Sequence, residues 1–584
     1  MHVVATAGHV DHGKSTLILT LTGTDPDRWA EEKQRGLTID LGFAHTVLPS
    51  GAAVSFVDVP GHVRFLKNML AGVGTVDACL FVVAATEGWK PQSEEHLRIL
   101  DLLGVRHGVV ALTKVALVDD DLLELALLDV EEHLQGTFLE NAEVVPVDAP
   151  TGLGIEALQE ALERLLGVTP VAVDRGRPRL WIDRVFAAKG SGTVVTGTLT
   201  GGELHQDDEL VVVGSTAVRN VRVRMLQTHG QRVVSVVPGH RVAINLAGVD
   251  HVDVERGDAL VRAVQWHRTR RFDARLDVLA ALGHPVSRRG AYAVAIGSGE
   301  LPAKVRILGD SALEPGDGGL VRIHLPRALP LVPGDRFILR DHGREETVGG
   351  GEILDVDPRL PASRARPDRS VLRVVTERGW VAAAELERLT GEKWTGALVA
   401  GSWVVDPRAL EHERDLLRSS AVGAGPLGLD PAGLSARARA VLGTLAEEGI
   451  AVHEGRVRVL ARPDPLADHP FISALMEHPY APPEGAGVDR SVLRELVRRG
   501  LVVEQDGVHF APAAVAGAAA VVAGLLAEHV DGVTVAQVRD ALGNTRKHVL
   551  PLLAHLDATG VTRRRGDLRL GGPKLPVAGE PSAR

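Results

Sequence analysis

Over residues 1–170, short apolar runs alternate with longer segments whose apolar residues recur with a helical period. The runs lie at 3–7, 54–57, 79–85, 109–112 and 144–147. Short apolar strands separated by amphipathic helices are typical of βαβ units around a parallel sheet. The pattern therefore predicts an α/β domain over residues 1–170, followed by a link that contains glycine and proline.

From residue 178 onward the pattern changes to β-branched runs punctuated by glycine, for example at 192–197 and 219–225. Such runs are typical of antiparallel barrels. We expect two all-β domains of barrel size, at 178–263 and 268–357, with a weak join near Trp266.

Helical periodicity returns between residues 366 and 574, with brief hairpin-like ends. The segment Asp-Arg-Ser-Val-Leu-Arg at 368–373 recurs at 489–494, and nine of 14 aligned residues are identical. The recurrence indicates repeated small modules, each with a helix, a glycine stop and a short strand pair, although one short match also fits coincidence. The Gly-rich stretch at 419–434 fits either an internal linker or a long loop inside one module.

Composition then limits the class of protein. A chain of 584 residues with 45% hydrophobic content is long enough for about four packed domains. Lys and Arg total 65 against 75 Asp and Glu, so a surface that binds nucleic acid has to be a local positive patch. The single cysteine, Cys79, excludes a disulfide framework and a Cys-based zinc site. The first residues are unlike a leader and no 18 apolar residues run together, so we expect a soluble, cytoplasmic protein with no membrane partner.

The segment Gly-His-Val-Asp-His-Gly-Lys-Ser at 8–15 has the spacing of a phosphate-binding loop. It follows an apolar strand and precedes a helical run, which is the context that the motif requires. Its glycines let main-chain N–H groups turn toward phosphate oxygens, Lys14 adds a cation, and the Ser15 hydroxyl is a ligand for Mg²⁺.

Two later segments supply what phosphoryl transfer needs around a third phosphate. Thr38 stands in a polar loop, where its hydroxyl can close on Mg²⁺. Asp58 ends an apolar strand and offers a carboxylate to the metal, Gly61 offers an N–H group to the phosphate, and His62 lies just beyond. We therefore expect a nucleoside triphosphatase.

These residues resemble the translational GTPases of the elongation factor Tu group. The resemblance implies that Thr38 binds Mg²⁺, that His62 is the catalytic residue that orients water on the ribosome, and that Val10 and Leu37 form a hydrophobic gate. Residues 185–198 are similar to the start of the family's second domain, and residues 333–337 and 347–351 to the end of its third. The GTP-binding residues that it implies are Gly8, His9, Val10, Asp11, His12, Gly13, Lys14, Ser15, Thr16, Asp58, Gly61, Thr113, Lys114, Asp148 and Ala149, with Ser15, Thr38 and Asp58 at the metal.

More than 200 residues follow position 357, and this long tail is similar to that of the selenocysteine-specific elongation factors. The resemblance implies a multidomain protein with an α/β P-loop GTPase domain, two β-barrel domains and C-terminal winged-helix repeats at 366–574. It implies GTP and Mg²⁺ as cofactors, and selenocysteinyl-tRNA, the ribosome and a selenoprotein mRNA hairpin as partners of a monomer.

The base-recognition motif departs from the family pattern. Guanine-specific members carry Asn-Lys-x-Asp, whose carboxylate accepts two hydrogen bonds from the base, whereas this chain reads Thr113, Lys114, Val115, Ala116. An unpaired guanine donor costs about 1–3 kcal/mol, so affinity for GTP and discrimination against adenine are both expected to suffer. One hypothesis is that the carboxylate of Asp148 or Asp119 replaces the missing group.

A second set of candidate residues concerns the amino acid. A selenol ionises far below the roughly 8.5 of a cysteine thiol, so the esterified residue is anionic at neutral pH. Asp183, Arg184 and Arg241 match the family's pocket positions. The alternative is that the arginines are exposed on a barrel strand.

The last candidate is a basic patch at 541–570, where six Lys and Arg stand against two Asp. Arg546 and Lys547 begin a helical run, and Arg563, Arg564 and Arg565 approach a Gly-Asp turn typical of a wing tip. We expect these five residues to bind RNA phosphates, the alternative being a solvated charged face. Pro551 requires that the helix bends or begins later than the pattern implies.

We interpret the chain as a GTP-dependent elongation factor that delivers selenocysteinyl-tRNA at UGA codons marked by an mRNA hairpin. The alternatives are a nucleotide-degenerate RNA-binding adaptor, which accounts for Ala116, and a general translation factor GTPase. A DNA-binding regulator would account for the winged helices, though not for the barrels.

Overall fold

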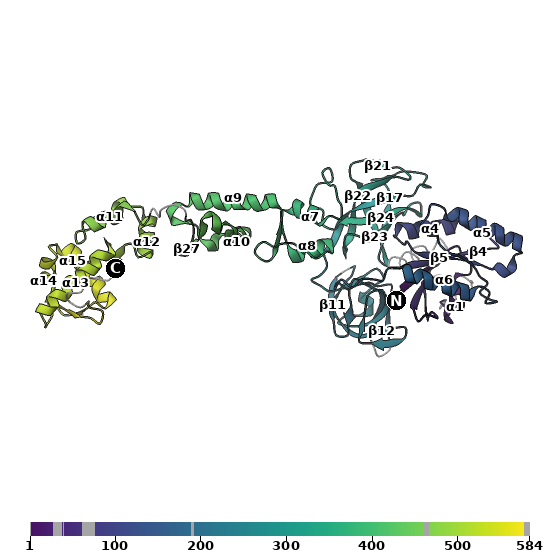
Figure 1. Ribbon diagram of the computed structural model, residues 1–584, viewed down its shortest axis with the longest axis horizontal. Helices are drawn as coiled ribbons and strands as arrows, with labels where there is room; N and C mark the ends of the chain where they lie inside the picture. Colours follow the sequence, from purple (N-terminus) through teal and green to yellow (C-terminus); the bar gives the residue numbers. More distant parts are fainter. Residues whose placement is uncertain are drawn as a thin grey trace. The chain divides into compact units, whose positions relative to one another are not determined.

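The computed structural model describes residues 2–26, 38, 40–60, 76–188, 192–215, 217–460 and 466–576 (Figure 1). By its internal contacts the chain divides into two compact units, Met1–Ala397 and Leu398–Arg584. Within the described ranges, no helix has both the length and the apolar character needed to cross a membrane. The α/β, double-barrel and winged-helix classes expected from the sequence are all confirmed.

The first domain is a six-stranded sheet of order β2-β3-β1-β4-β5-β6, parallel except for β2. Its elements are β1 (His2–Ala7), α1 (Lys14–Thr22), β2 (Gly42–Val47), β3 (Ala53–Asp58), β4 (Ala78–Ala84), α4 (Pro91–Leu102), β5 (Gly108–Thr113), α5 (Asp120–Leu134), β6 (Val144–Pro146) and α6 (Ile155–Val168). All seven residues of β4 are buried, as a central strand covered on both faces requires. Helices α1 and α6 pack on one face and α4 and α5 on the other. Because β1, β3, β4 and β5 run parallel, the loops at their carboxyl ends meet at one edge of the sheet.

The second domain is a barrel closed through β11, β16, β7, β9, β15 and β12. Its strands are β7 (Arg179–Trp181), β8 (Arg184–Ala188), β9 (Gly192–Thr200), β10 (Leu204–His205), β11 (Glu209–Val213), β12 (Val218–Thr228), β13 (Gln231–Val233), β14 (Ser235–Val236), β15 (Arg241–Ala247) and β16 (Ala259–Val261). Along β12, Val221 and Val223 face the core while Arg222 and Arg224 are exposed. This period of two is what a barrel wall with one wet face requires.

The third domain is a closed barrel of order β17-β22-β20-β19-β23-β24. Its strands are β17 (Arg268–Val278), β18 (Val286–Ser287), β19 (Tyr292–Ile296), β20 (Gly299–Ile307), β21 (Ala312–Leu313), β22 (Gly318–Pro330), β23 (Arg336–Asp341) and β24 (Glu346–Asp355). Ala295 and Ile338 belong to the same buried cluster as α4, so this barrel packs directly on the first domain.

The first unit ends with α7 (Val371–Arg378), β25 (Trp380–Ala382) and α8 (Ala383–Thr390). Arg373 of α7 is bound to Asp355 at 2.9 Å, and Arg378 to Asp357 at 3.1 Å. Because these carboxylates lie at the end of β24 and just after it, the ion pairs attach the helix to the third domain.

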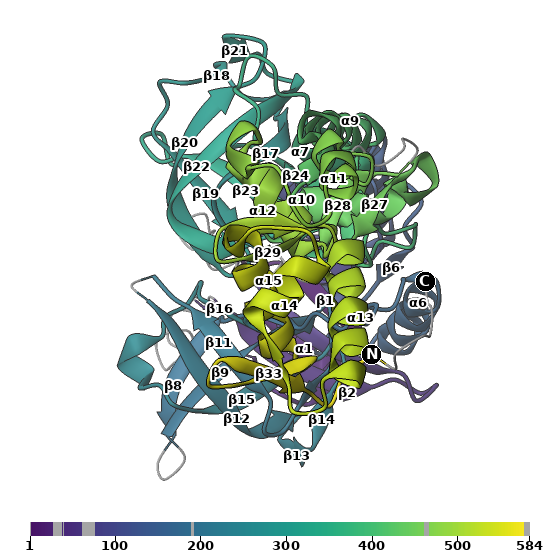
Figure 2. The same ribbon diagram turned by 90° about the vertical axis from the view of Figure 1, so that its left-hand side faces the viewer.

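The second unit contains the remaining modules of the tail. Its elements are β26 (Trp403–Val405), α9 (Pro407–Gly423), α10 (Ala436–Leu442), β27 (Ile450–His453), β28 (Arg456–Val459), α11 (Pro470–Glu477), α12 (Arg490–Arg498), β29 (Val503–Gln505), β30 (Val508–Phe510), α13 (Pro512–Glu528), β31 (Val533–Thr534), α14 (Val535–Ala541), α15 (Arg546–Thr559), β32 (Thr562–Arg565) and β33 (Leu568–Gly571). Figures 1 and 2 both show α13, α14 and α15 close together. The three helices share one buried cluster, and β31, β33 and β32 form the sheet of this module.

Three details of the tail differ from, or refine, the sequence interpretation. The Gly-rich stretch at 419–434 is neither wholly linker nor wholly loop, because α9 extends through Gly423. Helix α15 begins at Arg546 and contains the buried Pro551, so the alternative in which the helix begins later is wrong. Both repeated segments stand at helix starts. Helix α12 is followed by Gly500 and the β29–β30 hairpin as expected, whereas after Gly379 the strand β25 is followed by helix α8 instead of a hairpin turn.

Candidate functional site

The phosphate-loop motif connects the buried end of β1 to the first turn of α1. Gly8 has φ 127°, and a Cβ atom there would lie 2.1 Å from the carbonyl oxygen of Val82, so only glycine fits beside β4. Gly13, at φ 86°, leads directly into α1 at Lys14. The loop therefore presents the N-terminus of a helix at the sheet edge, which is a site that favours phosphate.

Lys14 is 6% exposed, and its ammonium group lies inside the loop. The Nζ atom donates to the carbonyl oxygens of Gly8 at 3.0 Å and His9 at 2.7 Å. A buried cation held by main-chain oxygens is positioned to exchange some of these bonds for phosphate oxygens.

The three residues expected at the metal lie together. Ser15 Oγ donates to Asp58 Oδ2 at 2.7 Å and is 2.9 Å from Thr38 Oγ1. The other oxygen of Asp58 accepts from Thr6 Oγ1 at 2.6 Å, so the carboxylate is oriented from two sides. Two hydroxyls and a fully buried carboxylate form a set of hard oxygen donors, which fits Mg²⁺.

Two further residues hold the phosphate loop from α4, and sequence reasoning missed both. His96 Nδ1 accepts from the N–H of Gly8 at 3.1 Å, and Gln92 Oε1 accepts from that of Val10 at 3.3 Å. Burial lowers the pKa of His96 to about 3, so the ring is neutral and able to accept. A four-residue spacing puts both side chains on one helix face, but nothing in the sequence says that this face meets the loop.

His12 is likewise buried, and its Nδ1 atom is 3.3 Å from the carbonyl oxygen of Val82. Burial lowers the pKa of His12 to about 4, so the loop carries no second cation from this ring at neutral pH. His9 and Val10 are half-buried, whereas Asp11 and Thr16 are exposed.

The residues expected at the base lie next to this loop. Thr113 Oγ1 donates to the carbonyl oxygen of His12 at 2.7 Å, so the end of β5 is attached to the loop. Lys114 adopts a left-handed conformation at φ 60°, and its Nζ is 3.1 Å from Glu87 Oε1. Ala149 is half-buried, and its carbonyl oxygen lies 3.4 Å from Thr20 Oγ1 of α1.

Both carboxylates considered as replacements for the missing acceptor have local partners. Asp119 Oδ1 caps α5 by accepting from the N–H of Leu122 at 2.9 Å. Asp148 Oδ2 accepts from Thr151 Oγ1 at 2.8 Å and from its N–H at 3.2 Å. Three of the residues predicted near the γ-phosphate, Leu37, Gly61 and His62, lie outside the described residues.

The arginines predicted at the amino-acid pocket meet between the first domain and the second. Arg241 pairs with Asp183 and places its guanidinium carbon 3.4 Å from the centre of the Phe43 ring. Arg184 donates to the carbonyl oxygen of Leu41 and lies 4.7 Å from the same ring centre. With side chains 20% and 15% exposed, neither Arg184 nor Arg241 is the solvent-exposed arginine of the alternative interpretation.

The side chains of Phe43, Arg184 and Arg241 line a pocket of about 330 Å³. Sequence reasoning missed its other functional groups, because they come from β2, β3 and the turn after β12. The rings of His45 and His229 stack at 4.3 Å, and His229 Nε2 is 3.1 Å from Ser55 Oγ. Burial, together with the nearby His45 and His240, lowers the pKa of His229.

Asp183 balances part of the positive charge of the pocket. Burial raises the pKa of this carboxyl, but the charge of Arg241 and hydrogen bonds from Arg241 and Thr196 lower it further, to below its usual value. Asp40 likewise offsets the charge of Arg184, at 3.8 Å, and of Arg256, at 3.2 Å. Three guanidinium groups thus face two carboxylates, which leaves the cluster positive.

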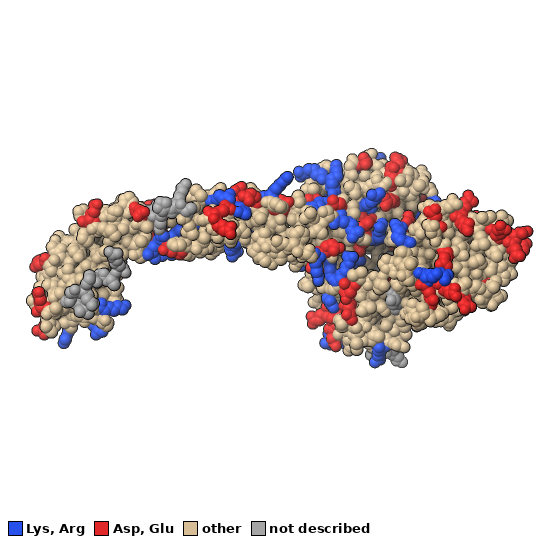
Figure 3. Space-filling view, in the orientation of Figure 1, with Lys and Arg blue, Asp and Glu red and all other residues tan. Residues whose placement is uncertain are grey.

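The basic residues predicted at the RNA surface are all exposed. Arg563, Arg564 and Arg565 stand on β32, while Arg546 and Lys547 begin α15. Lys547 forms an exposed ion pair with Glu484 at 2.9 Å. On the face shown in Figure 3, acidic and basic side chains occur together over much of the surface, in a chain whose net charge is −10.

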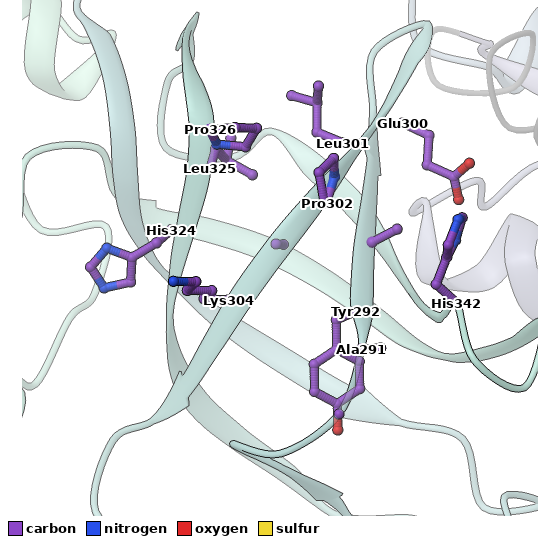
Figure 4. A pocket seen from close by; sticks show the side chains of 13 residues that line it. Ala291, Tyr292, Glu300, Leu301, Pro302, Lys304, His324, Leu325, Pro326 and His342 are labelled. Carbon is purple, nitrogen blue, oxygen red and sulfur yellow. The ribbon is translucent and has the colours of Figure 1, made fainter.

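A larger hollow, of about 1050 Å³, lies on the third domain and contains none of the predicted site residues. Figure 4 shows Glu300 beside His342 at one end, and His324 with Lys304 at the other. Its lining is mostly apolar, and these ionisable side chains stand at opposite ends, so they do not converge on one point as the polar groups of a nucleotide site do.

Comparisons with known proteins agree with this geometry. Residues 1–167 match the Elongation factor Tu GTP binding domain, 192–261 match Elongation factor Tu domain 2, 273–360 match the Selenocysteine-specific elongation factor beta-barrel domain, and 524–570 match the Elongation factor SelB winged helix.

Relatives and solved structures extend the similarity. The selenocysteine-specific elongation factor of Desulfomicrobium baculatum is 42% identical over 60% of this chain, and the match spans only 55% of that relative's length. A crystal structure of bacterial selenocysteine-specific elongation factor EF-Sec is 27% identical, with a TM-score of 0.74 over 98% of this chain and 99% of the other. Elongation factor SelB of Methanococcus maripaludis, in complex with the GTP analogue GppNHp, is 25% identical, with a TM-score of 0.53 over 61% of this chain and 79% of the other.

Proposed function

This chain belongs to the selenocysteine-specific elongation factors, within the translational GTPases of the elongation factor Tu group, and we propose that it delivers selenocysteinyl-tRNA to the ribosome in a GTP-dependent manner. The codon is a UGA that a selenoprotein mRNA hairpin marks. The observation that carries the proposal is the pocket in which Arg184 and Arg241 flank Phe43, directly beside a nucleotide-binding domain.

In this proposal GTP is bound on the phosphate loop. Lys14 contributes its buried positive charge to the phosphates, and Ser15, Thr38 and Asp58 hold Mg²⁺. When bound, the ion neutralises charge that develops on the phosphate oxygens. The contact between Ser15 and Thr38 supports the assignment, since it brings residue 38 from a distant loop to α1.

His62, just after the loop at the end of β3, is assigned to orient the attacking water once the ribosome is engaged. Hydrolysis then removes the phosphate that holds residue 38 against Ser15. A segment ordered by a third phosphate and released on its loss is a recurrent switch in such enzymes.

The pocket selects the amino acid by charge. A selenolate is anionic at neutral pH, whereas serine is neutral and cysteine is mostly protonated. Arg184 and Arg241 are held in place by Asp40 and Asp183, so little side-chain entropy is lost when an anion binds between them. The aminoacyl group is thus recognised by two preorganised cations on an aromatic floor.

The exposed arginines on β32 and at the start of α15 are assigned to the mRNA hairpin. Such contacts neutralise phosphates and give no base specificity by themselves. Binding the hairpin tethers the charged tRNA near the correct codon and raises its effective concentration there.

Filter binding of selenocysteinyl-tRNA and seryl-tRNA, each with GTP and with GDP, tests the proposal. Arg184→Ala is expected to weaken selenocysteinyl-tRNA binding by about tenfold or more and to leave seryl-tRNA binding nearly unchanged. Arg219→Ala, which removes a half-buried arginine of the same barrel that pairs with Asp253 and does not line the pocket, is the matched control. Equal losses for the two tRNAs would refute the pocket assignment, and the absence of ribosome-stimulated phosphate release would favour a non-hydrolysing adaptor.

A further inference from the structure

Two short segments next to the phosphate loop form the place where the base of a bound nucleotide lies. The Thr113 hydroxyl attaches one segment to the loop, and the N–H of Val115 reaches the carbonyl oxygen of Val147 at 3.5 Å. The carbonyl oxygen of Ala149, two residues after Val147, lies 3.4 Å from the Thr20 Oγ1 atom of α1. A base attached to phosphates at 8–15 therefore meets residues 114–116 on one side and 148–149 on the other.

On the first side, this chain offers no side-chain acceptor where the guanine-specific pattern has a carboxylate. Ala116 is exposed in a single 3-10 turn, Val115–Leu117, and ends in a methyl group. One oxygen of each carboxylate, Asp119 Oδ1 and Asp148 Oδ2, is engaged with its own turn, as described above. Moving either one toward the base would leave the N–H groups of a helix start or of Thr151 without a partner, which opposes the movement.

On the second side, a main-chain donor is free to read the base. Among the described residues, the N–H of Ala149 donates to no other group, and Ala149 itself is half-buried. An N–H donor pairs with the O6 acceptor of guanine, whereas adenine presents an amino donor at the same position. The same N–H group does not contact position 2 of the ring, where guanine has an amino group, hypoxanthine a hydrogen and xanthine an oxygen, so it does not distinguish these three bases.

We propose that the nucleotide site of this chain accepts 6-oxopurine nucleotides as a class, so that GTP, ITP and XTP bind alike and ATP is excluded by the Ala149 N–H. The inference rests on the proposed nucleotide site and names its ligand class. Ala116 then determines how many 6-oxopurines the site accepts. A carboxylate at this position would accept a hydrogen bond from the 2-amino group of guanine and would repel the 2-oxygen of xanthine.

Competition against a fluorescent GDP analogue, with the full chain and Mg²⁺ present, tests the proposal. Unlabelled GTP, ITP and XTP are expected to displace the analogue at concentrations within about fivefold of one another, and ATP only at more than about tenfold higher concentration. Ala116→Asp is expected to tighten GTP by about tenfold and to weaken XTP relative to GTP by at least as much.

The matched control is Leu117→Asp, which adds the same charge to the same turn at a side chain that is 72% exposed. It is expected to leave the order of the four nucleotides unchanged. Weakening of ITP or XTP by thirtyfold relative to GTP in the unaltered chain would overturn the inference while leaving the GTPase proposal intact, and equal binding of ATP would also overturn it. Failure of every nucleotide to displace the analogue, or of the analogue to bind, would instead refute the nucleotide site itself.

Discussion

Replacing Arg241 with methionine tests how the pocket between the first and second domains is held together. The guanidinium pairs with Asp183, donates to Thr196 at 3.0 Å and stacks on Phe43. Because the side chain of Asp183 is only 8% exposed, methionine leaves a nearly buried carboxylate without the cation that neutralises it. Breaking a buried pair from one side costs about 3–5 kcal/mol, and the partial exposure of Arg241 places the expectation near 3 kcal/mol.

The control is Arg219→Met in the same barrel. Arg219 pairs with Asp253 at 2.8 Å, but the two side chains are 28% and 43% exposed, so the loss is expected to be at most about 1 kcal/mol. Urea unfolding, followed by the fluorescence of the seven tryptophans, measures both losses as shifts in the midpoint at constant slope.

The dependence on pH gives the experiment a second readout. The pKa of Asp183 lies below its usual value, so its carboxylate stabilises the fold above about pH 4, and this contribution is lost as the pH falls through the folded pKa. In Arg241→Met the charge and hydrogen bonds of Arg241 are lost, and only Thr196 and the charge of Arg184 still oppose burial, so the pKa of Asp183 is expected to rise and the carboxyl destabilises the fold most at neutral pH. The difference between Arg241→Met and the unaltered chain should therefore narrow between pH 7 and pH 4. Equal losses in the two variants at pH 7, or a difference that does not change with pH, would refute the reasoning.

Three other residues or clusters make predictions of the same kind. Lys14→Ala is expected to weaken binding of a fluorescent GDP analogue by at least about a hundredfold, because the buried cation faces the phosphates; a loss below fivefold would contradict its role. His12 and His96, with pKa values of about 4 and 3, stay neutral in the fold while unfolded histidines protonate below about pH 6.5, so each lowers stability by about 2 kcal/mol at pH 5 relative to pH 7.5. His96→Gln, which keeps an acceptor for the Gly8 N–H, should remove about 2 kcal/mol of that loss in urea unfolding, and an unchanged pH profile would count against the assignment. Alanine at Arg563, Arg564 and Arg565 together should reduce the slope of hairpin binding against salt by about 2, whereas Arg539→Ala, in the same module, should not; equal slopes would place the RNA elsewhere.

The parts of the molecule that the sequence could predict are those with a local pattern. The phosphate loop is a contiguous motif between a strand and a helix, and the barrels repeat glycine and β-branched residues, so both follow from spacing. Phe43, His45 and His229 have no such pattern, because the pocket exists only when β2 packs against the turn after β12. The same holds for His96, whose contact with Gly8 joins residues 88 positions apart.

Charge counting was the least informative step, since it does not distinguish paired from exposed groups. Arg569, counted in the basic stretch at 541–570, is buried and bound to Asp557 at 2.9 Å. The pair leaves the net charge of the stretch unchanged but buries Arg569 and neutralises the half-buried Asp557. The sum therefore predicts a positive patch, while the residues available to RNA depend on which side chains the packing of α15 and β33 leaves exposed.

One short segment connects the nucleotide site to the amino-acid pocket. Thr38 contacts Ser15, Asp40 binds Arg184 and Arg256, and Phe43 lies beneath the two pocket arginines. From 38 to 43 the chain spans at most about 17 Å even when fully extended, so only five peptide units separate the two contacts. A ligand shifts a conformation only by its difference in affinity for two states, and a third phosphate has that difference if it draws Thr38 toward the metal donors. If Thr38 senses the phosphate and Arg184 the amino acid, as proposed above, a movement of Asp40 together with Thr38 would link nucleotide state to amino-acid affinity without any contact between the two ligands.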